Sequence, residues 1–101
     1  MIEYSWPDDS RAGRARDAWA ATVEDLPIGT HVTCEVIARQ PFGVFVQIDA
    51  VPEAIGLIEI TAMPRGAVLP APGKRLRGNV IEHAEHNHQV RINLSELAAT
   101  N

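Results

Sequence analysis

The stretch PFGVFVQI, residues 41–48, carries the alternation that decides which kind of domain this chain forms. Every second residue of its second half is aliphatic: Val44, Val46 and Ile48. This spacing places the three side chains on one face of a β-strand, where they can build a core. Phe45 falls on the opposite face, and Phe42 precedes the strand. Two of the few aromatic residues are therefore not needed to fill the core, and we expect them to face a binding partner.

Four further segments alternate in the same way, and each reads as a short strand. They are residues 31–39 (HVTCEVIAR), 54–60 (AIGLIEI), 75–83 (RLRGNVIEH) and 89–95 (QVRINLS). Residues 61–74, rich in Pro and Gly, predict an irregular connection with one short helical turn, and residues 84–88 predict a hairpin tip. Five short strands predict a small antiparallel barrel, either an OB-fold or an SH3-like barrel, and periodicity does not separate the two.

The N-terminal part has a different character. Residues 1–7 form a leader, and the Ala-rich segment after Pro7 predicts a helix that ends before Pro27. Trp19 lies on its apolar stripe and could anchor the helix to the barrel. The expected organisation is a leader and helix over residues 1–26, a barrel over 27–98 and a tail over 99–101.

Composition limits the functional classes. The chain of 101 residues has 46% hydrophobic residues, one cysteine and a net charge of −4 at pH 7. No apolar run approaches the roughly 20 residues of a membrane helix, and no signal peptide is visible. We expect a cytoplasmic monomer with Cys34 buried as a small hydrophobe and no membrane contact. The acidic balance excludes a surface that attracts phosphate everywhere, although basic residues cluster locally at 11–16 and 74–77.

The combination of PFGVFV (41–46), GLIEIT (56–61) and INLSEL (92–97) resembles the RNA-binding domain that is repeated in the large ribosomal protein S-one. The resemblance covers residues 27–97, in order and with matching spacing. It implies the five-stranded OB-fold, so the expected fold class is an all-β barrel, preceded by the N-terminal helix that residues 8–26 predict. It also implies binding of single-stranded RNA, and no pattern in the sequence leads us to expect a cofactor.

In that family, two aromatic residues, a histidine, an aspartate and an arginine form the RNA surface. By position, the resemblance places the aromatic pair at Phe42 and Phe45 and the arginine at Arg91. Glu59 stands where the family has its histidine, and Ala84 stands near the position of the aspartate, with Glu85 adjacent.

The chemistry of these side chains also favours binding of a single-stranded nucleic acid. Bases stack on aromatic rings, and each stack is worth roughly 1–3 kcal/mol. Phosphates need cations, for which the candidates are Arg91, Arg39, Arg75 and Arg77. Because Glu59 repels phosphate, we expect weak, salt-sensitive binding without sequence readout, in translation or in RNA turnover.

Three alternatives stay open. Phe45 could pack under the N-terminal helix with Trp19 covering it. The barrel could instead bind a protein through an apolar patch of Leu57 and Phe45, because the net charge and Glu59 disfavour RNA. His83, His86 and His88 resemble metal ligands, but a hairpin tip lacks the fixed geometry of a zinc site, so we expect no metal. No spacing typical of a nucleophile elbow or a phosphate loop occurs, and we expect no enzymatic activity.

Overall fold

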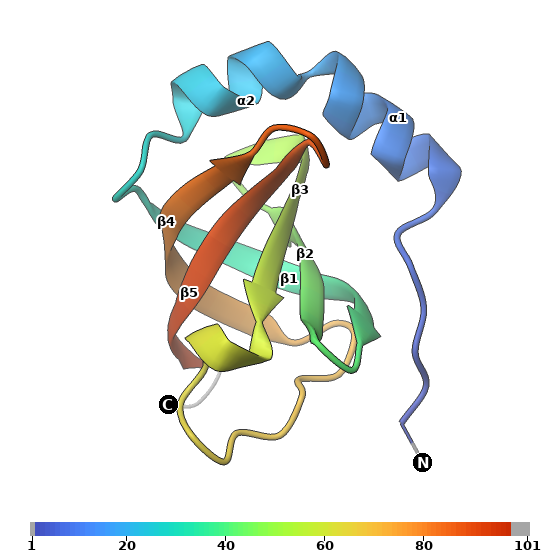
Figure 1. Cartoon of the computed structure of the whole chain (residues 1–101), viewed down its shortest axis with the longest axis vertical. Coiled ribbons are helices and arrows are strands. Elements are labelled where there is room, and N and C mark those ends of the chain that lie inside the picture. Colours follow the sequence, from blue (N-terminus) through green and yellow to red (C-terminus); the bar gives the residue numbers. More distant parts are fainter. Residues whose placement is uncertain (1, 98–101) are drawn as a thin grey trace.

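A computed structural model describes residues 2–97, with side chains described up to Ser95; the predicted tail at 99–101 lies outside the described residues. Five strands form a closed barrel in the order β1-β2-β3-β5-β4 (Figure 1). Their bounds are β1 His31–Gln40, β2 Gly43–Ile48, β3 Val51–Glu59, β4 Arg75–Ala84 and β5 Gln89–Leu97. The predicted helical turn in the long connection is a 3₁₀ helix, Ile60–Ala62. This architecture is the OB-fold arrangement that the sequence predicted.

One feature of the barrel corrects the prediction of a purely antiparallel sheet. β3 and β5 pair in parallel, with Leu57 opposite Arg91, whereas the other four pairings are antiparallel. Directions that alternate around a closed ring need an even number of strands. A ring of five must contain a parallel pair, because closure removes the free edges and leaves every strand with two neighbours.

The interior of the barrel is filled by the residues that the alternation selected. Val44, Val46 and Ile48 are fully buried, and Cys34 lies among them. Gly43 begins β2 where a Cβ atom would collide with the carbonyl oxygen of Ile58, so this entry into the strand requires glycine. The aliphatic face of the opening stretch is therefore the core of the fold.

The predicted N-terminal helix is two helices, α1 Asp9–Asp17 and α2 Trp19–Asp25, separated by Ala18. Asp8 caps α1, since its carboxylate accepts a hydrogen bond from the backbone N–H of Arg11 at 2.8 Å. Both helices arch over one end of the barrel, and the chain before them runs down its side (Figure 1). We call this preceding segment, residues 2–8, the N-terminal strap. No helix within residues 2–97 combines the length and the apolar character that crossing a membrane requires.

Trp19 anchors α2, but not on Phe45. Its indole packs against the barrel core and makes edge-on ring contacts with His83 and His88, with centroids 6.3 and 5.7 Å away. These histidines lie at the β4–β5 hairpin, and α2 crosses that end of the barrel. Phe45 is indeed covered, as one alternative expected, but residues other than Trp19 cover it.

Candidate nucleic-acid interface

Phe45 belongs to a second apolar cluster on the outside of the barrel. Its ring is 1% exposed. The other buried members are Ala15, Ala38, Ile55 and Leu57. Ala15 comes from α1, which packs against β3, so the helix closes over the outer face of the sheet. In this arrangement Phe45 presents no face to a base, and a stacking role for it stays a prediction that requires the cover to change.

Three aromatic rings lie in mutual contact at the edge of this cluster. The centroid of Trp6 is 5.9 Å from that of Phe42 and 5.7 Å from that of Phe45, and the two phenylalanine rings are 5.9 Å apart, edge to face. Exposure rises from 1% at Phe45 through 42% at Phe42 to 65% at Trp6. The aromatic surface that water can reach is therefore formed by Phe42 and by a residue of the strap.

Hydrogen bonds through Arg39 attach the strap to β1. The backbone N–H of Ser5 donates to the carbonyl oxygen of Arg39 at 2.9 Å, and Nε of Arg39 donates to the carbonyl oxygen of Glu3 at 3.1 Å. The same guanidinium reaches the carbonyl oxygens of Leu69 and Pro70 at 3.4 and 3.5 Å. Within residues 2–97 no carboxylate pairs with Arg39, so its charge, carried three residues before Phe42, is bonded only to carbonyl groups there.

Arg91 shares the outer face with Phe45, since Phe45 pairs with Leu57 and Leu57 pairs with Arg91. Its guanidinium is neutralised on two sides. One terminal nitrogen forms an ion pair and hydrogen bond with Glu59, and Nε lies 3.6 Å from a carboxylate oxygen of Glu82. Glu59 therefore does more than repel phosphate, because it holds the cation that would attract it.

The remaining predicted cations lie on β4. Arg75 forms an ion pair with Asp49 and lies 3.7 Å from Glu35, and the hydrogen bond with Asp49 raises the pKa of the guanidinium. Arg77 is exposed on the same strand. Ala84, where the family has an aspartate, is buried at the end of β4.

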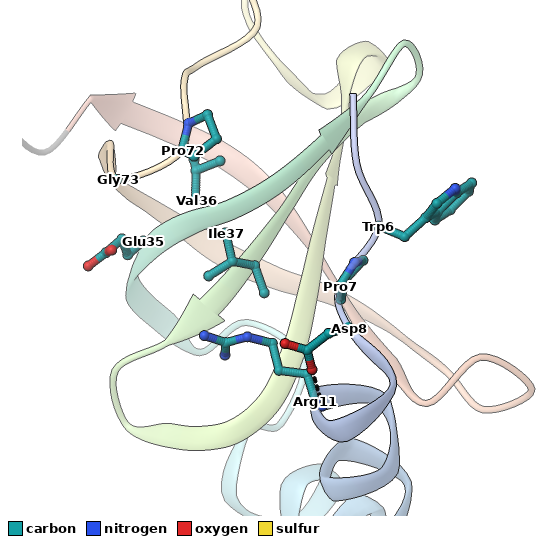
Figure 2. Close-up of a pocket in the computed structure, with 9 residues that line it drawn as sticks. All are labelled: Trp6, Pro7, Asp8, Arg11, Glu35, Val36, Ile37, Pro72 and Gly73. Carbon is teal, nitrogen blue, oxygen red and sulfur yellow. Dashed lines mark hydrogen bonds between the residues drawn. The ribbon is translucent and has the colours of Figure 1, made fainter. Parts of the chain in front are cut away.

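A pocket of about 400 Å³ lies between the strap, the start of α1 and β1 (Figure 2). Asp8, Arg11 and Glu35 give it charges of both signs, and Val36 and Ile37 supply apolar walls. The indole of Trp6 is directed away from these residues in Figure 2. Trp6 nevertheless borders the pocket, and the mixed charges of the pocket select no ligand class.

The described residues contain neither a cluster of metal ligands nor a reactive thiol. Within residues 2–97, no three side chains among His, Cys, Asp and Glu gather as metal ligands. A ring nitrogen of His83 is instead 2.7 Å from the carbonyl oxygen of Leu26. Cys34 is buried, as predicted, and burial raises the pKa of its thiol to about 12, so the thiolate is not populated at neutral pH.

Comparisons with known proteins agree on the barrel. No family model matches the chain, and no curated protein matches it. Among solved structures, RNase R of Mycoplasma genitalium is similar over 83% of this chain and 15% of its own, with 18% identity and a TM-score of 0.67. GSP13 of Bacillus subtilis is similar over 75% of this chain and 61% of its own, with 22% identity and a TM-score of 0.59.

A multidomain protein with nucleic-acid-binding domains from Streptococcus pneumoniae is similar over 68% of this chain and 23% of its own, with 19% identity and a TM-score of 0.59. The chain spans less than two thirds of each of these three proteins. At such identities the likeness establishes the OB-fold barrel. The narrower resemblance to the S-one domain stays a prediction.

Sequence reasoning overlooked Trp6. The leader MIEYSWP contains Tyr4 and Trp6, two of the five aromatic residues, in a segment with no strand or helix pattern. Such a concentration of aromatic residues outside any predicted element was the available indication that the leader packs on the barrel.

Proposed function

We propose that this chain is a non-catalytic module that binds single-stranded RNA weakly and with little sequence preference, within translation or RNA turnover. The observation that carries the proposal is the half-exposed ring of Phe42 on the same β1–β2 hairpin as Arg39, which has no carboxylate partner among the described residues, on an OB-fold barrel. An aromatic platform with a neighbouring cation is what a flexible strand of nucleotides requires, because bases stack and phosphates pair. One structural neighbour, RNase R, has been solved with ribose-methylated single-stranded RNA.

Electrostatics should keep the binding of RNA weak. Arg91 and Arg75 already have carboxylate partners, so a phosphate must compete with Glu59, Glu82, Asp49 or Glu35 for them. The net charge of −4 adds long-range repulsion. Binding should therefore depend on Phe42 and Arg39 and should weaken steeply with salt.

The test is a titration of a fluorescently labelled single-stranded oligonucleotide at low salt, followed by anisotropy and by amide chemical shifts. Shifts at residues 42–48, 59 and 91 are expected. Replacing Phe42 by Ala should weaken binding about fivefold or more, through loss of one stack. The control is Val68→Ala, which truncates a more exposed apolar side chain in the connection between β3 and β4. Absence of binding, or equal effects of the two variants, would contradict the proposal.

Arg39 supplies a second arm of the test. Arg39→Gln should reduce the slope of log affinity against log salt by about 0.7, the value for one phosphate contact on a single strand. Arg65→Gln removes the same charge from an exposed position in the long connection and should leave the slope unchanged if binding is local.

A protein-binding role is the second candidate, favoured by the carboxylate partners of Arg91 and Arg75. The apolar patch expected for it does not exist in this form, because Phe45 and Leu57 are 1% and 7% exposed. Co-purification of one protein that survives ribonuclease treatment would favour this role. An association that ribonuclease destroys would favour RNA.

A further inference from the structure

We infer that Trp6 of the N-terminal strap is the principal base-stacking residue. It would take the stacking role that the sequence assigned to Phe45, whose ring is buried. This inference rests on the proposed function and extends it to a residue outside the barrel. Trp6 contacts Phe45 and Phe42 at nearly equal centroid distances, 5.7 and 5.9 Å. Its 65% exposure makes it the most accessible of the three rings.

Phe45 itself is not accessible to a base. A base needs an open ring face, and Phe45 has 1% of its surface accessible. Removing the strap alone would not free this ring, since Ala15 of α1 and Ile55 and Leu57 of β3 belong to the same cluster. A base would have to displace helix and strap together, at the cost of exposing the whole cluster. Stacking on the outermost ring avoids that cost.

The indole of Trp6 is preorganised for stacking. The indole rests against two phenylalanine rings, and hydrogen bonds through Arg39 fix the backbone on both sides of Tyr4. A ring that is held in place loses little conformational entropy when a base stacks on it. Covering this exposed ring with a base also removes more apolar surface from water than covering any other side chain would, because indole has the largest apolar face.

The charge near the strap differs from that around Arg91 and Arg75. The guanidinium of Arg39 bonds to the strap on one side of Trp6, and Arg11 follows in the first turns of α1. Within residues 2–97, Arg11 and Arg39 form no ion pair with a carboxylate side chain, in contrast to Arg91 and Arg75. Arg39 is therefore the cation available to a phosphate next to a base stacked on Trp6, whereas the side chain of Arg11 extends into the pocket, away from the indole (Figure 2).

A structural role for Trp6 as an apolar plug over Phe45 makes a different prediction. Leucine can replace a plug, because it fills the contact with Phe42 and Phe45, but it offers no π-face. We expect Trp6→Leu to weaken binding of single-stranded RNA about 5- to 100-fold and Trp6→Phe to keep it within about threefold of the wild type. Tyr4→Leu makes the same kind of change at an exposed ring of the same strap and should alter binding less than twofold.

A measurement that leaves Trp6 intact completes the experiment. Trp19→Phe makes Trp6 the sole tryptophan, and the indole N–H of Trp19 lacks an acceptor among the described residues, so this change removes no hydrogen bond there. Titration with a single-stranded oligonucleotide should quench the emission of Trp6, and a duplex of the same sequence should not compete, since its bases are already stacked.

The outcomes separate the two proposals. Wild-type protein that binds no single-stranded RNA overturns the proposed function and this inference with it. Binding that Trp6→Leu leaves unchanged or strengthens, or binding without quenching, overturns this inference and leaves the proposed function standing. Strengthened binding would mean that the strap blocks the surface of Phe45. Thermal melting of each variant verifies that the barrel is folded.

Discussion

Trp6 and Trp19 both precede the barrel, yet they meet it in different ways. Trp19 is half-buried at the end of the barrel, where it packs on the core and touches two histidines of the β4–β5 hairpin. Trp6 lies on the side, over Phe42 and Phe45, and stays 65% exposed. The end is thus closed like a core, whereas the side keeps an aromatic surface in contact with water. The difference separates a residue that stabilises the fold from one placed to meet a partner.

The largest effect should come from the ring beneath the strap. Phe45→Ala should lower the free energy of unfolding by about 3–5 kcal/mol, since it empties a fully buried site. Phe42→Ala, at the half-exposed neighbouring ring, should cost about 1 kcal/mol or less. Urea denaturation followed by circular dichroism measures both. Equal costs would mean that the side of the barrel is not packed like a core.

The two tryptophans themselves give the next comparison. Trp19→Ala should cost about 2–3 kcal/mol, below the range for a fully buried ring because the indole is partly exposed. Trp6→Ala should cost about 1 kcal/mol, since most of that ring already faces water. A reversed order, measured by the same denaturation, would identify the strap as the structural element and α2 as the accessory one.

A pH series tests whether the interior stays closed. Burial, and then the charge of Asp49, raise the pKa of the Cys34 thiol from 9.0 to about 12. Above pH 9 the unfolded chain loses a proton that the folded chain keeps, so the free energy of unfolding should fall as pH rises, by about 1 kcal/mol per unit. Cys34→Ala should lack this contribution. Parallel curves for the two proteins between about pH 8 and 10 would show that the thiol is accessible.

The smallest effect concerns the ion pair of Glu59 with Arg91. Glu59→Gln should release one partner of Arg91 and strengthen RNA binding about two- to fivefold at low salt, an advantage that added salt removes. Glu53→Gln removes the same charge from an exposed position of β3 and serves as the control. If the two variants gain equally, the effect is one of net charge, and Arg91 lies outside the interface.

Much of the fold could be predicted, because strand alternation is a local property. Val44, Val46 and Ile48 face inward as their spacing indicated, and the five strands occupy nearly the predicted ranges. The candidate site was harder to predict. Phe42 has the expected exposure, but the cover of Phe45 comes from Trp6 and Ala15, which are remote in sequence. The partner of Arg91 is Glu59, which lies on another strand.

By itself, the sequence determined the barrel. The alternation of side chains with a period of two determines which of them face inward. When five such strands close into a barrel, the backbone N–H and C=O groups of every strand find hydrogen-bond partners. Tertiary structure alone decided which aromatic ring is exposed to water and which arginine forms an ion pair with a carboxylate. Both depend on contacts between segments far apart along the chain, where burial and ion pairing are set by position in space and not by spacing in sequence.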